Sequence, residues 1–437
     1  MSHRRDFLKA SAIAAGTAAS ANMVGAFARG QDTIKVGLIG CGGRGNGAVK
    51  DILTADDKVE IVAFGDVFEE KAKDSQKKWA ADKKFGARIK ATPDTCFGGL
   101  NAYQKVIDAT PDLVILATPP GFRPYHLEAA VKAKKNIFCE KPVAVDAAGI
   151  RKCLSLVEEV KKAGIALVAG TQRRHQKGYI ETVKAIHDGA IGDVITARCS
   201  WNGQGIWFKE RKEGQADAEY QLQNWYHYLW LCGDQIVEQH VHNLDVINWV
   251  MKSHPVKAVA LGGRATRDAV IAAQIAKNPR FKDTPIGDPK EYGQIWDHFA
   301  VEFEYPDGQK LFSYCAHIAG CKSDVSETVY GSKGTCKVNN YAVGKKKIGE
   351  DSDVSPYVQE HIDLLRSIRE GKPLNELQSV AESTFTSILG RDAAYSGKEL
   401  AWDKHLAEGV STMPANLALG MSIPVTAAPV PGKGKTA

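Results

Sequence analysis

A glycine-rich loop near the start of the chain constrains the fold more than any other feature. The pattern Gly40-x-Gly42-x-x-Gly45 follows an apolar run, Ile34–Ile39, and precedes an amphipathic stretch. Between a strand and a helix, such glycines allow a tight turn, close approach of the backbone to a pyrophosphate and close packing of helix on strand. The N–H groups that open the helix would face the phosphates. The alternative is a structural turn that binds nothing.

An acid stands where a dinucleotide site needs one. Asp66 ends the next apolar run, 21 residues after Gly45, so its carboxylate can accept hydrogen bonds from the adenosine ribose. The same charge would repel a 2′-phosphate. We therefore expect NAD as the cofactor, with NADP less favoured.

Apolar strands alternate with amphipathic helices from Thr33 onward, which predicts an α/β fold with a doubly wound parallel sheet of the Rossmann type. We assign residues 29–172 to this domain. The expected strands are Ile34–Ile39, Val59–Gly65, Leu113–Ala117, Asn136–Cys139 and Ile165–Ala169. The expected helices include Glu69–Ala81, Tyr125–Lys134 and Asp146–Lys162.

A second kind of pattern follows, the two-residue alternation of half-buried strands. It appears in Val194–Asn202, in Trp296–Tyr305 and, after a Pro-Asp-Gly turn, in Lys310–Ile318. We expect a second, substrate-binding domain over residues 173–402.

The C-terminal part contains two helical patterns, Gln359–Arg369 and Val380–Ala394. Residues 403–437 form a tail whose last stretch, Ala427–Ala437, we expect to be disordered. Ala265–Lys290 has no strong periodicity and is interpreted as an insertion, a loop with one helix.

The first residues are typical of an export signal. Arg4-Arg5 precedes Phe7-Leu8-Lys9, and a weakly apolar stretch ends in Ala26-Phe27-Ala28. This is the form of a twin-arginine signal cleaved before Arg29, which makes residues 1–28 a signal peptide and the mature protein periplasmic or otherwise exported. A membrane anchor is the alternative, but the segment is short and rich in alanine. Because this route exports folded proteins, we expect the cofactor to be loaded in the cytoplasm and tightly bound.

Charge and cysteine usage exclude two classes of protein. The formal net charge of the 437 residues is only +6, without the basic stripe that nucleic-acid binding requires. The nine cysteines are scattered and contain no CxxC pair, so they do not indicate a disulfide framework. We expect mostly buried thiols, and the sequence also allows one or two disulfides.

Several further segments resemble the glucose–fructose oxidoreductase/inositol dehydrogenase (Gfo/Idh/MocA) family. They are Leu116-Ala117-Thr118-Pro119-Pro120, His126-Leu127-Glu128-Ala129-Ala130, Lys135 to Pro142 with its Cys-Glu-Lys-Pro ending, Gly170 to His175, and Ala190-Ile191-Gly192-Asp193-Val194. The resemblance implies a Rossmann domain followed by an α+β domain with an open, mostly antiparallel sheet. It also implies that substrate lies between the sheet and the nicotinamide. We expect a homo-oligomer, a dimer or tetramer formed through that sheet.

The resemblance and the glycine loop together predict the cofactor contacts. The loop between Pro119 and His126 is about two residues longer than the family spacing, which leaves the contacts there open. The predicted cofactor-binding residues are Gly40, Gly42, Gly43, Arg44, Gly45, Asp66, Thr118, Pro119, Glu140, Lys141 and Gln172.

Three residues are expected to perform the chemistry. Lys141 is the lysine of the Glu-Lys-Pro motif, where it can hydrogen-bond a substrate oxygen and stabilise charge during proton loss. Glu238 occupies the family's usual Asp position in Asp-x-x-x-His-x-x-Asp, and His242 and Asp245 match the rest. On one helix, these positions would share a face. The alternatives are a salt-bridged surface lysine and a structural histidine.

A metal site is the rival interpretation of this segment. Glu238, His240 and His242 could bind an ion together with His298 or His317. Because His240 and His242 would face different sides of a helix, we expect no metal.

We predict that the substrate is contacted by Arg174, Tyr226, His227 and Asp245. The surrounding segment, Trp225–Trp230, is unusually aromatic, and Trp201, Trp207, Tyr292 and Trp296 add to it. Aromatic faces suit the C–H faces of sugars, although core packing or a subunit interface would explain them equally well.

The predicted function is oxidation of a secondary alcohol of a sugar, glycoside or cyclitol, with hydride transfer to NAD(P). One alternative is a glycosidase, lyase or epimerase that oxidises a sugar carbon transiently and then returns the hydride. Another is a non-catalytic NAD-binding or scaffold protein. The partner is a small carbohydrate; we expect no nucleic acid and no membrane anchor.

Overall fold

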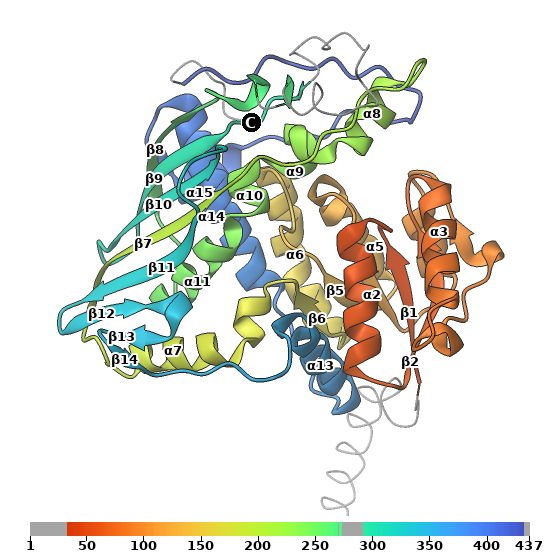
Figure 1. Ribbon diagram of the computed structural model, residues 1–437, viewed down its shortest axis with the longest axis horizontal. Coiled ribbons are helices and arrows are strands. Elements are labelled where there is room, and N and C mark those ends of the chain that lie inside the picture. Colours follow the sequence, from red (N-terminus) through yellow and green to blue (C-terminus); the bar gives the residue numbers. More distant parts are fainter. Residues whose placement is uncertain (1–32, 270, 273–291, 432–437) are drawn as a thin grey trace, which may run out of the picture.

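A computed structural model describes residues 33–269, 271–272 and 292–431, which form two sheets joined by helices (Figure 1). The predicted signal, residues 1–28, lies outside the described residues, as does most of the insertion predicted at Ala265–Lys290. No helix in the described ranges is long and apolar enough to cross a bilayer.

The first sheet is parallel and doubly wound, as predicted. Its strand order is β3-β2-β1-β4-β5-β6, so the order reverses on either side of β1. The strands are β1 Ile34–Ile39, β2 Val59–Gly65, β3 Cys96–Phe97, β4 Leu113–Leu116, β5 Asn136–Cys139 and β6 Leu167–Ala169. The helices of this part are α2 Gly43–Ala55, α3 Glu69–Ala80, α4 Ala102–Asp108, α5 Arg123–Lys132 and α6 Ala147–Ala163.

The strands of this sheet form where the sequence has short apolar runs, because both faces are covered by helices. The four residues of β4 are all fully buried. Helices α2 and α3 pack on one face, and α4, α5 and α6 pack on the other. All six carboxyl ends therefore meet at one edge, where ligands bind in such folds.

The second sheet is mostly antiparallel, with the order β14-β13-β12-β11-β7-β10-β9-β8-β15. The pair β7 and β10 is parallel. The strands are β7 Val194–Gly203, β8 Lys257–Gly263, β9 His298–Glu304, β10 Lys310–His317, β11 Asp324–Gly331, β12 Gly334–Lys337, β13 Ala342–Val343, β14 Lys346–Lys347 and β15 Leu400–Ala401. The helices are α7 Lys177–His187, α8 Asp217–Gln223, α9 Leu229–Cys232, α10 Gln235–Glu238, α11 Val241–Met251, α13 Pro356–Arg369, α14 Leu377–Ser396 and α15 Trp402–Glu408.

Helices fill the space between the two sheets, as Figure 1 shows for α10, α11 and α14. Side chains of α6, α11 and α14 belong to one continuous apolar core that reaches both sheets. On the opposite face of the second sheet, Phe312 and Tyr314 point outward, each 38% exposed among the described residues.

Helix α13 returns from the second domain to the first. Leu364 and Leu365 of α13 belong to the same apolar cluster as α2 and β1. The linear division at residue 172 therefore describes the sheets but not this helix, which covers the face of the Rossmann sheet that carries α2.

The tail is more ordered than its composition predicts. Apolar side chains between Met413 and Val425 pack against α8 and α9, and the carbonyl of Pro429 accepts a hydrogen bond from Trp296 Nε1 at 2.9 Å. Pro429, within the stretch predicted to be disordered, thus contacts the second domain; residues 432–437 lie outside the described ranges. All nine cysteines are free thiols, and Cys321 is exposed.

Candidate active site

A cavity of about 380 Å³ lies between the two domains. The Rossmann sheet contributes the carboxyl ends of β1, β2, β4 and β5, and the second domain contributes residues of β7, α10 and α11. The predicted residues that line it are Gly40, Gly42, Gly43, Arg44, Asp66, Thr118, Pro119, Glu140, Lys141, Glu238 and His242.

The three glycines of the loop have different roles. Gly40 has a φ of +103°, and a Cβ there would lie 2.5 Å from the backbone of Ala117. A Cβ on Gly45 would lie 1.9 Å from the Gly40 oxygen, so Gly45 allows α2 to approach the loop although it does not line the cavity. Around Gly42 and Gly43, no described atom lies within 4 Å of an added Cβ. These two positions therefore face open space at the start of α2.

Asp66 lies at the end of β2 with its carboxylate held by backbone. Oδ2 accepts from Cys41 N at 2.8 Å and Oδ1 accepts from Phe68 N at 3.0 Å. These bonds hold the carboxylate at the cavity wall, where it retains lone pairs for ribose hydroxyls.

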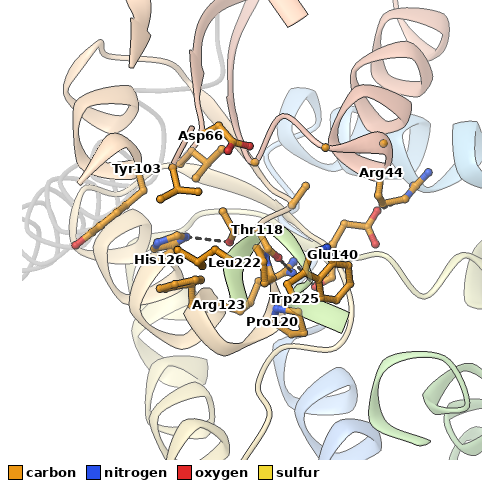
Figure 2. A pocket seen from close by; sticks show the side chains of 18 of the residues that line it. Arg44, Asp66, Tyr103, Thr118, Pro120, Arg123, His126, Glu140, Leu222 and Trp225 are labelled. Carbon is orange, nitrogen blue, oxygen red and sulfur yellow. Dashed lines mark hydrogen bonds and ion pairs between the residues drawn. The ribbon is translucent and has the colours of Figure 1, made fainter. Parts of the chain in front are cut away.

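An aromatic stack forms another wall (Figure 2). His126 lies 4.3 Å from the Tyr103 ring and 5.9 Å from the Phe122 ring, centroid to centroid, and shares a hydrogen bond of 3.1 Å with Thr118. Burial, reinforced by the charge of Arg123, lowers the pKa of His126 to about 3, so its imidazole is neutral.

Sequence reasoning missed Arg123, the first residue of α5, which follows the lengthened loop after Pro119. Its guanidinium is buried and donates to three carbonyls: Leu116 at 2.6 Å, Glu140 at 2.7 Å, and Thr118. It thereby ties the ends of β4 and β5 together beneath the cavity. The extra loop length was the only signal that could have indicated it.

Arg44, on the first turn of α2, points toward the Glu-Lys-Pro motif (Figure 2). Its Nε donates to Glu140 Oε1, and its terminal nitrogens contact Asp51 at 3.5 Å and Glu360 at 3.4 Å. Residues distant in sequence therefore surround the glycine loop with an ion-pair network.

Lys141 and Glu238 meet in the cavity wall, one from each domain. The Lys141 ammonium donates to the Glu238 carbonyl at 2.5 Å and lies 3.4 Å from its carboxylate oxygen Oε1. Both side chains are largely buried, at 11% and 14% exposed. An ammonium has three N–H donors, so one remains for a ligand once these contacts within the described residues are made.

The segment that contains Glu238 and His242 is not one helix. It is interrupted at Gln239 and His240, between α10 and α11. Both side chains nevertheless line the cavity, whereas Asp245 points elsewhere. His242 stacks on Trp201, with the ring centroids 5.7 Å apart. Burial, and then the charge of Lys141, lowers the pKa of His242 well below its ordinary value.

Two predicted substrate residues instead lie behind the cavity wall. Tyr226 is buried, and burial together with the neighbouring Glu238 raises the pKa of its phenol well above its ordinary value. His227 is also buried and bonds the Trp207 carbonyl at 2.8 Å. Trp225, next to them in sequence, lines the cavity.

The other two predicted substrate residues bind each other. Arg174 makes hydrogen bonds of 2.9 to 3.0 Å to both carboxylate oxygens of Asp245. Asp245 also accepts from Ser383 at 2.8 Å. Each charge is thus paired in a bidentate contact, and neither residue lines the cavity. Gln172 is likewise outside the cavity wall and donates to Tyr357 Oη at 3.3 Å.

The histidines of the rival metal interpretation have separate partners. His240 contacts Ser313 at 2.7 Å, His317 contacts Gln239 at 2.7 Å, and His298 contacts Asp297 at 2.7 Å. Within the described residues, no three His, Cys, Asp or Glu side chains converge as metal ligands.

The residues at the glycine loop fit a dinucleotide. Gly42, at the N-cap of α2, has no side chain to cap the first N–H groups, and the loop leaves room at Gly42 and Gly43 for a pyrophosphate. Asp66 lies where an adenosine ribose would follow, and Lys141 and His242 line the same cavity.

Comparison with known proteins agrees with this geometry. Residues 34–170 match a family model described as an oxidoreductase family with an NAD-binding Rossmann fold. Residues 179–337 match the GFO/IDH/MocA C-terminal domain.

The chain is also similar to curated enzymes. It is 24% identical over 308 residues to an inositol 2-dehydrogenase of Rhizobium meliloti, covering 70% of this chain and 76% of that enzyme. It is 28% identical over 242 residues to an inositol 2-dehydrogenase of Azotobacter vinelandii, covering 54% of this chain but only 60% of that enzyme.

Experimental structures share the fold. An aldose-aldose oxidoreductase from Caulobacter crescentus, complexed with glycerol, superposes with a TM-score of 0.59 at 18% identity, over 84% of this chain and 99% of that one. GenD2 from gentamicin A biosynthesis, in complex with NAD, gives 0.60 at 16% identity, over 85% and 96%.

Proposed function

The chain belongs to the Gfo/Idh/MocA family of NAD-binding oxidoreductases, and from this premise we propose that it is an exported enzyme. It transfers a hydride between a tightly held NAD and a secondary alcohol of a sugar, glycoside or cyclitol. The named relatives that act on inositol support a polyhydroxylated ring as substrate.

One observation carries this proposal. Lys141, Glu238 and His242 line the same cavity as the glycine loop and Asp66. The Lys141 ammonium lies in the cavity wall beside the Glu238 carboxylate, and the neutral His242 imidazole lines the same cavity. A purely structural lysine would not need this position.

The division of roles follows from the protonation states. Bound nicotinamide would accept the hydride from the substrate carbon. His242 is neutral and can accept the hydroxyl proton. The free N–H of the Lys141 ammonium can donate to the same oxygen and stabilise its developing negative charge. Glu238 holds this ammonium in place and can accept a hydrogen bond from a second hydroxyl.

Export and cofactor retention belong together in the proposal. Arg4-Arg5 and the residues after it have the form of a twin-arginine signal, and free dinucleotide is scarce outside the cytoplasm. An exported enzyme would then keep its cofactor. A second substrate would return the cofactor to its starting oxidation state in the same site. Fractionation of cells into periplasm and cytoplasm tests the location.

A mass spectrum of the denatured, periplasmic protein tests the cofactor. We expect one NAD per chain. Recovery of folded protein that contains no dinucleotide and takes none up would contradict the proposal and favour a non-catalytic role.

Lys141→Met tests the chemistry. Because the variant loses the charge that faces the substrate oxygen, we expect turnover to fall by roughly 10²–10⁴-fold, measured with a panel of cyclitols and sugars. Bound NAD and thermal stability should stay as in the wild type. A variant that fails to fold would instead make Lys141 structural.

Glycosides in the same panel separate net oxidation from transient oxidation. The proposal predicts oxidised product and reduced cofactor. Release of free aglycone without a change in cofactor state would favour the redox-neutral alternative.

We also propose that the chain forms a homo-oligomer through the outer face of its second sheet. Leu261 and Val259 of β8 are 75% and 39% exposed. With Phe312 and Tyr314 of β10, they place large apolar side chains on one face of one sheet. Contiguous apolar surface of this kind marks contact sites between proteins.

A further inference from the structure

Helix α13 reaches the glycine loop from more than 300 residues downstream. Tyr357, in its first turn, lines the cavity together with Gly42, Gly43 and Arg44. The Tyr357 ring lies 4.8 Å from the Arg44 guanidinium carbon, within the range of a cation–π contact. A residue of the second domain thus covers the start of α2.

A second residue of α13, Glu360, also contacts the Arg44 guanidinium. Glu360 is fully buried, and its Oε1 lies 3.4 Å from Arg44 Nη2. Together with Glu140 and Asp51, it occupies three of the five N–H donors of Arg44. Among the described residues, the other two donors have no partner, and the cation lies in the first turn of α2 beside Gly42 and Gly43.

Helix α13 is itself firmly anchored. Asp363 accepts a hydrogen bond of 2.8 Å from His175, and Glu376 lies 3.2 Å from the other ring nitrogen. These two carboxylates outweigh the effect of burial and raise the pKa of His175 to about 10. At the far end, Arg369 binds Asp56, just after α2, at 2.8 Å. Tyr357 is therefore presented from a rigid support.

We propose that Tyr357 of α13 and Arg44 of α2 form a clasp over the pyrophosphate position, which slows the release of NAD. The inference rests on the proposed function and deepens it, because it gives retention of the cofactor a structural cause. Glu140 and Glu360 orient the guanidinium, and the Tyr357 ring packs on it. The dinucleotide can leave only when this contact opens.

Exchange of the retained cofactor tests the clasp. Purified holoprotein is incubated with excess isotopically labelled NAD, and the bound fraction is followed by mass spectrometry after rapid desalting. Tyr357→Leu removes the ring, and we expect NAD to exchange about tenfold faster, as loss of a partly desolvated cation–π contact implies. Tyr357→Phe keeps the ring and should exchange at nearly the wild-type rate.

A matched control separates the clasp from loosening of the helix. Asp56→Asn removes the ion pair at the opposite end of the α2–α13 contact, far from the cavity, and should leave the exchange rate unchanged. Equal exchange rates in Tyr357→Leu and the wild type, with NAD bound to both, would overturn the clasp and leave the proposed function intact. Faster exchange in Asp56→Asn than in Tyr357→Leu would also overturn it. Absence of bound NAD from the wild type would overturn both.

Discussion

At the scale of single residues, burial decides which groups can react. His242 lies in the cavity wall, where desolvation and the Lys141 charge keep its imidazole neutral. Glu238 and Lys141 are held together, so the charge of each is balanced before substrate arrives. Arg174 and Asp245 are also charged and adjacent, but they bind each other and do not line the cavity. Charge alone therefore does not identify a functional group; an unsatisfied donor or acceptor at the cavity does.

The pH dependence of turnover tests the state of His242. The neutral form of His242 acts as the base, so protonation would inactivate the enzyme. Because the pKa of His242 is lowered, protonation requires a pH below the ordinary histidine range near 6.5. We therefore expect kcat/KM to stay constant as the pH falls from about 8 to about 6, and His242→Asn to lose most of the activity. An acid limb at about 6.5 that disappears in His242→Asn would contradict this assignment.

Replacement of Asp66 tests cofactor choice. Asp66→Ala removes the carboxylate that would accept from the ribose hydroxyls and repel a 2′-phosphate, so the preference for NAD over NADP should fall about tenfold or more. Titration with both cofactors measures it. An unchanged NAD/NADP preference would show that Asp66 does not select the cofactor. Unchanged thermal stability would show that a lower preference does not result from loss of the two backbone hydrogen bonds of Asp66.

At the scale of elements, the turn between β1 and α2 shows how one motif contains two kinds of glycine. Gly40 and Gly45 are required by the backbone itself, because an added methyl group would overlap neighbouring atoms. Gly42 and Gly43 are not required by packing, since the space beside them is open. Their small size therefore serves whatever occupies the cavity.

A pair of alanine substitutions separates these roles. Gly45→Ala places a methyl group 1.9 Å from the Gly40 oxygen, and we expect it to destabilise the protein by about 1–3 kcal/mol and to release NAD. Gly43→Ala should keep the melting temperature of the NAD-free protein at the wild-type value while NAD binding weakens. Thermal melts and NAD content measure both. Equal melting temperatures for the two variants would contradict the assignment of Gly45 to backbone packing and of Gly43 to cofactor binding.

At the scale of the whole molecule, one face of the second sheet is buried, and the other carries exposed apolar side chains within the described residues. Its inner face joins the core that runs through α14 to the Rossmann sheet. Its outer face exposes apolar side chains of β8 and β10, which lie on either side of β9. Burying this face against a second copy would remove it from water.

Leu261→Glu tests this interface. Leu261 is 75% exposed in the single chain, so a charge there should not disturb folding but should dissociate the oligomer, measured by size-exclusion chromatography with light scattering. Ile180→Glu, at a 42% exposed position of α7 outside the sheet, is the matched control and should keep the wild-type mass. A monomeric wild type, or an oligomer that survives Leu261→Glu, would contradict the proposal.

The sequence by itself determined the elements whose cause is local. Apolar runs predicted five Rossmann strands close to their observed bounds, and glycine spacing predicted the turn before α2, because hydrophobic periodicity and φ preferences act over a few residues. The motif residues Lys141, Glu238 and His242 were likewise recognisable.

Only the tertiary structure decided which charged groups face the cavity and which face each other. Arg174 and Asp245, 71 residues apart, became a closed pair. Tyr357 and Glu360 arrived at Arg44 from a helix more than 300 residues away. Such pairings depend on how helices pack on sheets, which is decided by burial of apolar surface across the whole chain and leaves no trace in local sequence.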